Sequence, residues 1–426
     1  MPKLKKKTRQ MQPSRMLVLG FSIIILAGAT LLFLPISSKS GQFSSFIDCL
    51  FTATSATCVT GITVLDTFTY FNGFGQGVIL ALIQVGGLGF LTLVTFINLI
   101  LGKKLGWSTV KIAASDLTDN ALETTPKRLF YEIVLYSFAI EFVGAVILAF
   151  VFVPDFGALG IFEAIFLSVS AFCNAGFDLF GQFGAYSSLV PYVHNYYVQA
   201  VVMFMIIAGG LGFMVWVELI QYPKKRKLSL HARVVLIFSV LLWVGGAALI
   251  GLMEWNNPAS MGGLSVSDKI MASLFQSVST RTAGMNTIDL AACGPITKLL
   301  MSVLQFIGAA PGSTGGGVKV TTFAVIILTI RSVAQGRDDC VIADHHIESK
   351  TVYRALTIIV IGALAAFGSA VVVYYNTSDA VSVIDAIFES CSAFGTVGLS
   401  VGVTARLKDG AKLLYMAVMY MGRVGP

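Results

Sequence analysis

Four short stretches of the sequence end in glycine and repeat one pattern of small and hydroxylic residues. They read FTATSATCVTG, FLSVSAFCNAG, FQSVSTRTAG and FESCSAFGTVG, and they end at Gly61, Gly176, Gly284 and Gly398. Glycine permits backbone angles that a Cβ atom would often forbid, so the peptide carbonyls near it can be turned to one side. A ring of backbone carbonyls can replace the hydration shell of a cation. The repeated pattern therefore predicts a cation-binding wall made of backbone oxygens.

Each glycine would complete one wall of an ion-selectivity filter, together with the four residues before it. The alternative is that the small residues only allow tight packing between helices, as in GxxxG contacts. One such stretch would favour the packing interpretation, whereas four stretches in the same order favour the filter. The predicted filter residues are Thr57, Cys58, Val59, Thr60, Gly61, Phe172, Cys173, Asn174, Ala175, Gly176, Thr280, Arg281, Thr282, Ala283, Gly284, Phe394, Gly395, Thr396, Val397 and Gly398.

A second glycine signature follows each stretch further along the chain. It reads GGLG from Gly86 and from Gly209, GAAP from Gly308, and GRVG from Gly422. Two signatures that recur in the same order four times indicate an internal repeat, which is the first feature to establish when a fold is predicted.

The composition places these repeats in a membrane. Of the 426 residues, 56% are hydrophobic and 12% are charged, and the mean hydropathy is +0.82. Soluble globular proteins carry about 25% charged residues, and a membrane helix needs roughly 20 apolar residues. The predicted spans are 16–35, 77–101, 129–153, 197–220, 231–253, 299–333, 355–375 and 411–426. Between the members of each pair lies an apolar stretch too short to cross, and these re-entrant stretches are 46–56, 161–172, 268–280 and 383–394.

Positive charges fix the expected orientation. Lys and Arg crowd the first 15 residues and the three links between repeats, whereas few lie in loops within a repeat. The positive-inside rule then puts both termini and the links in the cytoplasm. Every repeat points the same way, which suits a ring around one axis rather than the inverted repeats of many carriers. We predict an all-α membrane protein in which four helix–pore loop–helix repeats surround one central pore. A basic cytosolic N-terminus at 1–15 precedes the four repeats, which are expected at 16–101, 129–220, 231–333 and 355–426.

Acidic residues recur near the start of the short stretches. Asp48, Glu163 and Asp385 each lie three residues before the first phenylalanine of the pattern, and the third stretch has Asp268 at an earlier position. An acid at a helix N-terminus is favoured by the partial positive charge there. The opposite end of each short helix would then direct a partial negative charge at the filter, which favours a cation. A simple capping role fits the same residues.

The third repeat departs from the pattern in the stretch 299–333, which is too long for one straight crossing. Its middle reads GAAPGSTGGGVK, and a proline with five glycines does not stay helical. We predict a broken helix with a gating loop at 308–319. A phosphate-binding loop is excluded because Val318 separates Gly317 from Lys319. The predicted gate residues are Gly308, Pro311, Gly312, Ser313, Thr314, Gly315, Gly316, Gly317, Lys319 and Arg423.

Arg423 joins this set through the repeat alignment, because it takes the place of Gly87 and Gly210 in the second signature. A charge at membrane depth costs about 2.5–3.5 kcal/mol or more, and arginine stays protonated there. It must therefore face water or a partner. The gating loop is one such partner, and a structural salt bridge to Glu141 is the other. For Glu141, midway along 129–153, we favour a hydrogen-bonded structural role over proton coupling.

The loops SxRTAG at 279–284 and SAFGTVG at 392–398, with GRVGP at 422–426, resemble the Ktr/Trk/HKT superfamily of potassium transporters, most closely the bacterial Ktr membrane subunit. The resemblance covers essentially the whole chain. It implies potassium uptake with sodium sensitivity, with potassium at the four filter glycines. It also implies a multi-pass protein of the cell membrane that forms a homodimer with one pore per subunit. Its partner would be a cytosolic ring of RCK-type nucleotide-binding subunits. Family members continue past the final proline, so the fourth repeat is expected to be truncated.

Other functions find little support in the residues. No cluster of His, Asp, Glu and Cys converges, so we do not expect an enzyme. No GxGxxG follows a strand, so a nucleotide would act through a partner rather than bind this chain. The confinement of basic charge to the links argues against nucleic acid, and the six cysteines lack any CxxC pair and are expected to be buried. The remaining alternative is a sodium- or proton-coupled secondary carrier of another cation.

Overall fold

Helices dominate this computed structural model, which describes residues 13–89, 126–336, 340–342, 345–377 and 381–425. The regular strands in these ranges form one short hairpin, β1 (Cys340–Ile342) with β2 (His345–Ile347), in the link between the third and fourth repeats. The sequence did not predict this hairpin. Most of the predicted cytosolic N-terminus and residues 90–101 of the first repeat lie outside the described residues.

Each repeat contains a first helix, a short pore helix and a second helix, so the predicted all-helical architecture is confirmed. The first helices are α1 (Pro13–Phe33), α7 (Pro126–Phe156), α11 (Leu230–Glu254) and α15 (Ser349–Asn376). The pore helices are α2 (Phe46–Thr57), α8 (Leu159–Phe172), α12 (Val266–Ser279) and α16 (Val383–Gly395). The second helices are α4 (Gly73–Gly87), α9 (Tyr196–Gly210), α13 (Pro295–Phe306) and α17 (Asp409–Val424). Short helical turns in the loops are η1 (Pro35–Ser37), α3 (Thr67–Tyr70), η2 (Phe180–Phe183), η3 (Val190–Tyr192) and η4 (Thr404–Arg406).

The outer helices carry the apolar surface of a membrane protein. Within the described residues, α7, α11 and α15 are each long and apolar enough to cross a membrane. Large apolar side chains on them are exposed, including Leu252 at 78%, Phe150 at 74% and Leu364 at 70%. Extensive exposed apolar surface marks contact with a membrane or a partner, and these helices pass the length and hydropathy test for spanning. The protein is therefore a multi-pass helical membrane protein.

Most of the pore helices have the same type of N-terminal cap, and all four have a buried phenylalanine at the same place. Three of them begin with a serine whose hydroxyl accepts a hydrogen bond from the amide of the aspartate three residues later, a favoured N-terminal cap. The pairs are Ser45–Asp48, Ser265–Asp268 and Ser382–Asp385. Asp268 thus holds the same place in its helix as the other two aspartates, although the repeat pattern set it apart. The phenylalanines that open the four patterns are fully buried and anchor the pore helices in the core; they are Phe51, Phe166, Phe275 and Phe388.

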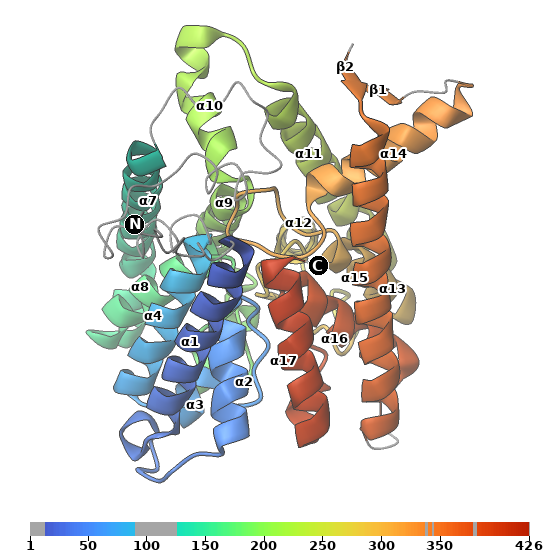
Figure 1. Ribbon diagram of the computed structural model, residues 1–426. Coiled ribbons are helices and arrows are strands. Elements are labelled where there is room, and N and C mark those ends of the chain that lie inside the picture. Colours follow the sequence, from blue (N-terminus) through green and yellow to red (C-terminus); the bar gives the residue numbers. More distant parts are fainter. Residues whose placement is uncertain (1–12, 90–125, 337–339, 343–344, 378–380, 426) are drawn as a thin grey trace, which may run out of the picture.

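Two of the second helices are followed by a break. Residues 197–220, expected to be a single span, form α9 and α10 (Phe213–Lys225), which are bent by 101° at Leu211–Gly212. In the third repeat, α13 ends at Phe306 and α14 (Val320–Ala334) begins after a loop. We call residues 308–319 the intramembrane loop. The two described links, which follow α10 and α14, lie at the upper side in Figure 1, whereas the loop between α1 and α2 lies at the lower side.

Candidate functional site

The four glycines that end the pore loops meet in one ring. We use pore loops for residues 57–61, 172–176, 280–284 and 394–398. A Cβ atom on any of these glycines would crowd the backbone of the next repeat: Gly61 faces Gly176, Gly176 faces Gly284, Gly284 faces Gly398, and Gly398 faces Gly61. The four repeats therefore close on one another, and only glycine fits at this level. We call this set the glycine ring.

The backbone of each pore loop alternates in handedness. The glycines of the ring have φ between +71° and +101°. The residue two places earlier is also left-handed in every loop, with φ from +50° to +80°, at Val59, Asn174, Thr282 and Thr396. Valine and threonine rarely adopt this conformation, and strain of this kind is concentrated at functional sites. Alternating handedness turns successive carbonyls to the same side of the chain, which an ordinary extended strand cannot do.

The amide groups of the pore loops bond to the pore helices behind them. Thr60 N, Ala175 N and Val397 N donate to serine carbonyls five residues earlier, at 2.8, 2.8 and 2.9 Å. In the third repeat the stretch from this serine to the ring glycine is one residue shorter, and Ala283 N donates to Ser279 O at 3.0 Å. Because the amides face the pore helices, the carbonyls face the ring axis. No hydrogen bond from a described residue reaches the carbonyls of the last three residues of any pore loop. Buried carbonyls without a partner are costly, so this column of oxygens suits a cation.

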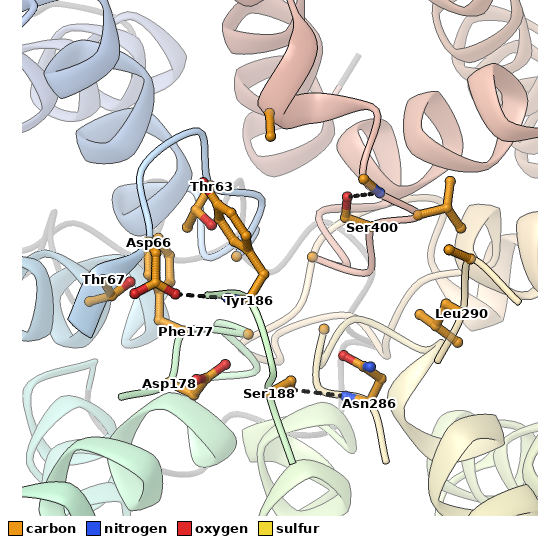
Figure 2. Close-up of a pocket in the computed structure, with 18 of the residues that line it drawn as sticks. Thr63, Asp66, Thr67, Phe177, Asp178, Tyr186, Ser188, Asn286, Leu290 and Ser400 are labelled. Carbon is orange, nitrogen blue, oxygen red and sulfur yellow. Dashed lines mark hydrogen bonds between the residues drawn. The ribbon is translucent and has the colours of Figure 1, made fainter. Parts of the chain in front are cut away.

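The glycine ring opens on one side into a cavity of about 260 Å³, which we call the mouth cavity. All four ring glycines line it, together with Asp66, Asp178 and Asp289, and Figure 2 shows Asp66 beside Tyr186 and Asp178 below them. Asp66 is held by the amides of Thr69 and Tyr186, at 2.7 and 2.9 Å. Acidic groups around a concave surface attract cations and raise their local concentration.

The carboxyl group of Asp178, which lies in a loop outside the spanning helices, has a raised pKa. Burial raises its pKa to about 7, the hydrogen bond from the Phe180 amide opposes that shift, and the nearby Asp66 carboxylate adds to it. The charge of the mouth cavity therefore changes near neutral pH.

The intramembrane loop lies against the opposite ends of the pore loops. Thr314 Oγ1 donates to the carbonyl of Phe172, the first residue of the second pore loop, at 3.2 Å. Gly316 N donates to Thr396 Oγ1 at 3.0 Å. A Cβ on Gly315 would collide with the Thr282 side chain. The loop therefore touches three of the four pore loops on the side away from the mouth cavity.

Backbone hydrogen bonds hold the intramembrane loop to the ends of neighbouring helices. Its base is closed by Gly308 N to Val318 O at 2.8 Å. Ala310 N and Thr314 N donate to Gly210 O and Gly209 O at the end of α9, at 3.0 and 3.2 Å. Other contacts of the loop residues are Phe213 N to Gly312 O at 3.0 Å, Gly317 N to Gly422 O at 3.1 Å, a Cβ clash between Gly212 and the Pro311 carbonyl, Ser313 Oγ to Ala310 O at 2.6 Å, and Lys319 Nζ to Gly315 O at 2.6 Å.

Arg423 bridges the intramembrane loop and α4. Its Nη1 donates to the Thr314 carbonyl and its Nη2 donates to the Gly86 carbonyl. The alternative salt bridge to Glu141 is wrong. Glu141 Oε1 instead accepts a hydrogen bond at 3.0 Å from Nε2 of Gln84, two residues before Gly86 on α4.

The second signature has a physical cause that the sequence did not reveal. A Cβ on Gly86, Gly209 or Gly422 would collide with the carbonyl of the first residue in a pore loop, which is Thr57, Phe172 or Phe394 respectively. These glycines let the second helices approach the pore loops closely. Gly308, the equivalent residue of the third repeat, faces Gly316 of the intramembrane loop instead.

Side chains of the pore loops contact one another and the intramembrane loop. Asn174 and Thr282 lie within 3.0 Å of each other and join the second and third loops. Arg281 runs to the Gly308 carbonyl. Five of the six cysteines are buried and free, as expected, and they are Cys49, Cys58, Cys173, Cys293 and Cys391; the side chain of Cys340 lies outside the description. Across the part of the chain that the structure describes, no group of three His, Cys, Asp or Glu residues could hold a metal ion.

The sequence interpretation missed the acids of the mouth cavity and two ion pairs between repeats. Asp66, Asp178 and Asp289 each follow a ring glycine within five residues, and this recurrence was the available signal. The ion pairs join pore helices to the second helix of the preceding repeat, and they are Lys298–Asp385 at 2.8 Å and Lys412–Asp48 at 2.6 Å.

Comparisons with known proteins agree with this geometry. The TrkH family model, described as cation transport protein, matches residues 3–426. The potassium/sodium uptake protein NtpJ of Enterococcus hirae is 38% identical over 99% of this chain and 93% of its own. The Ktr system potassium uptake protein B of Bacillus subtilis is 37% identical over 97% of this chain and 91% of its own. The crystal structure of the potassium transporter TrkH from Vibrio parahaemolyticus has the same fold, with a TM-score of 0.73 over 99% of this chain and 85% of that chain at 20% identity. With four pore-loop repeats closed into a ring and a family match along almost its whole length, the chain belongs to the TrkH family of cation transport proteins.

Proposed function

We propose that this chain carries potassium ions into the cell across the plasma membrane, with the pore loops as the selectivity filter and the four ring glycines as potassium contacts. The observation that carries this proposal is the glycine ring, in which four left-handed glycines present carbonyls that no described residue bonds. Such oxygens replace the water that a cation loses on entering the filter. The choice of potassium is supported by the relatives, which are named for potassium uptake.

The intramembrane loop is the gate in this proposal, together with Arg423. Its contacts with Phe172 and Thr396 support a position across the ion path directly below the filter. Arg423 holds the loop closed through Thr314 and adds a fixed positive charge that raises the barrier for cations. Opening then requires the loop to exchange a few backbone hydrogen bonds, which a regulatory partner can bias.

The remaining parts of the proposal concern orientation and assembly. Both termini and the links between repeats face the cytoplasm, because the links carry the basic residues, and the two described links, after α10 and α14, lie at the same side of the fold in Figure 1. The chain forms a homodimer with a cytosolic RCK-type nucleotide-binding ring, and sodium stimulates uptake. The resemblance to Ktr membrane subunits supports these assignments, and the chain itself binds no nucleotide.

Tracer rubidium uptake into proteoliposomes tests the proposal. The purified protein should take up rubidium down its gradient without a fixed requirement for sodium or protons. Deleting Gly312–Gly317 should raise the flux, since it removes the part of the loop that contacts Phe172 and Thr396. Uptake that saturates and requires one sodium or proton for each rubidium would identify a secondary carrier instead. A folded deletion variant with lower flux would show that the loop supports the filter rather than closing it.

A further inference from the structure

Arg281 is a charged residue at a place where the other repeats have small ones. The equivalent positions hold Cys58, Cys173 and Gly395. The Arg281 side chain is only 4% exposed and does not line the mouth cavity. Its Nη2 donates to the carbonyl of Gly308, the first residue of the intramembrane loop, at 3.1 Å. The charge is therefore directed behind the filter and toward the proposed gate.

The surroundings of Arg281 stabilise its charge in the membrane interior. Arginine does not lose its proton in proteins, so the charge needs compensation. The Gly308 carbonyl lies two residues beyond Phe306, the last residue of α13, near the helix end that carries partial negative charge. The guanidinium carbon also lies 5.6 Å from the centre of the Trp243 ring, a geometry that attracts cations. Nε and Nη1 have no hydrogen-bond partner among the described residues, so Gly308 is the one protein acceptor found there.

Gly308 is also the residue that closes the base of the intramembrane loop. Its amide bonds Val318 O at 2.8 Å, and Val318 N bonds Phe306 O at 3.3 Å. Its carbonyl bonds Arg281, which belongs to the third pore loop. The next residue, Thr282, has φ +80° and faces Gly315 of the intramembrane loop. A displacement of the loop base is therefore transmitted to the third wall of the filter through one short chain of contacts.

We propose that Arg281 is a positioning residue that fixes the third pore loop to the base of the intramembrane loop, so that ion selection and gate position are coupled. This inference rests on the proposed filter and gate. Coupling of binding between two sites is reciprocal. Movement of the loop base therefore alters selection in the filter, and potassium in the filter stabilises one position of the loop.

Substitution of Arg281 tests the proposal through selectivity. Arg281→Gln should lower the ratio of rubidium to sodium uptake by roughly tenfold or more, because it removes a charge-assisted hydrogen bond. Arg281→Lys should recover much of the ratio, since its ammonium can still donate to the Gly308 carbonyl. Arg226→Gln, at an exposed arginine after α10, is the matched control and should leave the ratio unchanged.

Two further measurements separate this inference from the function on which it rests. Gly398→Ser is assayed in parallel as a direct change to the filter. If it lowers the ratio while a folded Arg281→Gln keeps the wild-type value, the positioning role is refuted and the filter stands. If neither variant changes the ratio, the proposed filter fails as well.

The second measurement uses the wild-type protein and so does not depend on whether a variant folds. Hydrogen exchange of the peptide covering 307–319 is compared in potassium and in choline. Coupling predicts slower exchange in potassium, and equal exchange in the two media would overturn it. Where Arg281→Gln folds, the difference between potassium and choline should shrink.

Discussion

Gly398 offers the sharpest test of the filter because the three nearest neighbours of its missing side chain are all backbone atoms. A Cβ there would collide with the Thr60 carbonyl, and it would lie 3.0 Å from Gly284 Cα and 3.2 Å from Gly61 Cα. Backbone atoms cannot rotate away as the end of a long side chain can. Gly398→Ala must therefore displace the carbonyls of neighbouring walls. Its φ of +101° adds roughly 1–2 kcal/mol for any residue with a Cβ.

Gly402 supplies the matched control. It has φ +88°, but no atom lies within 4 Å of a Cβ built on it. Gly402→Ala therefore carries a similar backbone cost without the collision. The difference between the two alanine variants isolates the effect of displacing the ring from the effect of a strained backbone.

The assay is competition between tracer rubidium and sodium in proteoliposomes, with thermal unfolding measured on the same samples. We expect Gly402→Ala to lose a little stability and keep the wild-type ratio of rubidium to sodium. Gly398→Ala should lower that ratio by about tenfold or more, which corresponds to about 1.4 kcal/mol of discrimination. The filter assignment is refuted if folded Gly398→Ala keeps the ratio, whatever its stability.

Three further predictions follow from named contacts. Acidification from pH 8 to pH 6 should weaken the apparent affinity for rubidium, because Asp178, whose pKa is raised to about 7, loses its negative charge. In a pH titration of uptake, Asp178→Asn should remove this dependence. Lys412→Met and Asp48→Asn should each lower the unfolding temperature, and a double-mutant cycle should give a coupling of about 1 kcal/mol for this largely buried pair. Arg423→Ala should increase rubidium flux if the arginine holds Thr314 in place; reduced flux with reduced expression would indicate a structural bridge.

The pore helices could be predicted from the sequence because the residues that indicate them lie close together in the chain. The re-entrant stretches 46–56 and 161–172 coincide with α2 and α8 to within two residues. A buried phenylalanine and a terminal glycine lie within one short stretch in every repeat, and in three of the four repeats a capping serine precedes them. One such stretch does not distinguish a pore loop from simple helix packing, but its recurrence in four repeats does.

The bend between α9 and α10 could not be predicted from the sequence in the same way. A GGLG signature also ends α4 in the first repeat, and Gly89 and Gly212 have similar left-handed φ values of +75° and +89°, so these letters indicate the end of a helix but not the direction of the chain after it. The bend coincides with contacts from the third repeat: Gly212 lies against the Pro311 carbonyl, and Phe213 N donates to Gly312 O. The direction of α10 therefore depends on residues distant in the chain, and the local sequence does not predict it.

The alignment makes Arg423 equivalent to Gly87 but does not predict the direction of its side chain. Both of its acceptors are backbone carbonyls that any residue type would supply. Glu141 was considered as its partner because both lie at mid-depth, but Gln84 is the residue that reaches it. Partners of this kind depend on how helices are rotated about their axes.

Equivalent residues differ among the four repeats, so the four walls of the filter should respond differently to substitution. Lys298 and Lys412 stand at the same distance before the second signature as Gln76 and Gln199. The glutamines bond carbonyls of their own repeats, whereas the lysines reach the pore helix of the next repeat.

The ring glycines show the same inequality. The nearest contact of a Cβ on Gly176 is 3.0 Å, to the Ala283 carbonyl, whereas Gly61, Gly284 and Gly398 would each meet a carbonyl at a clearly closer approach. A contact of 3.0 Å is relieved by a small shift of the neighbouring backbone, but the closer contacts require the carbonyl itself to turn away from the axis. Serine at position 176 should therefore disturb the ratio of rubidium to sodium uptake least among the four serine substitutions. An equal effect at all four glycines would show that the ring deforms as a unit rather than wall by wall.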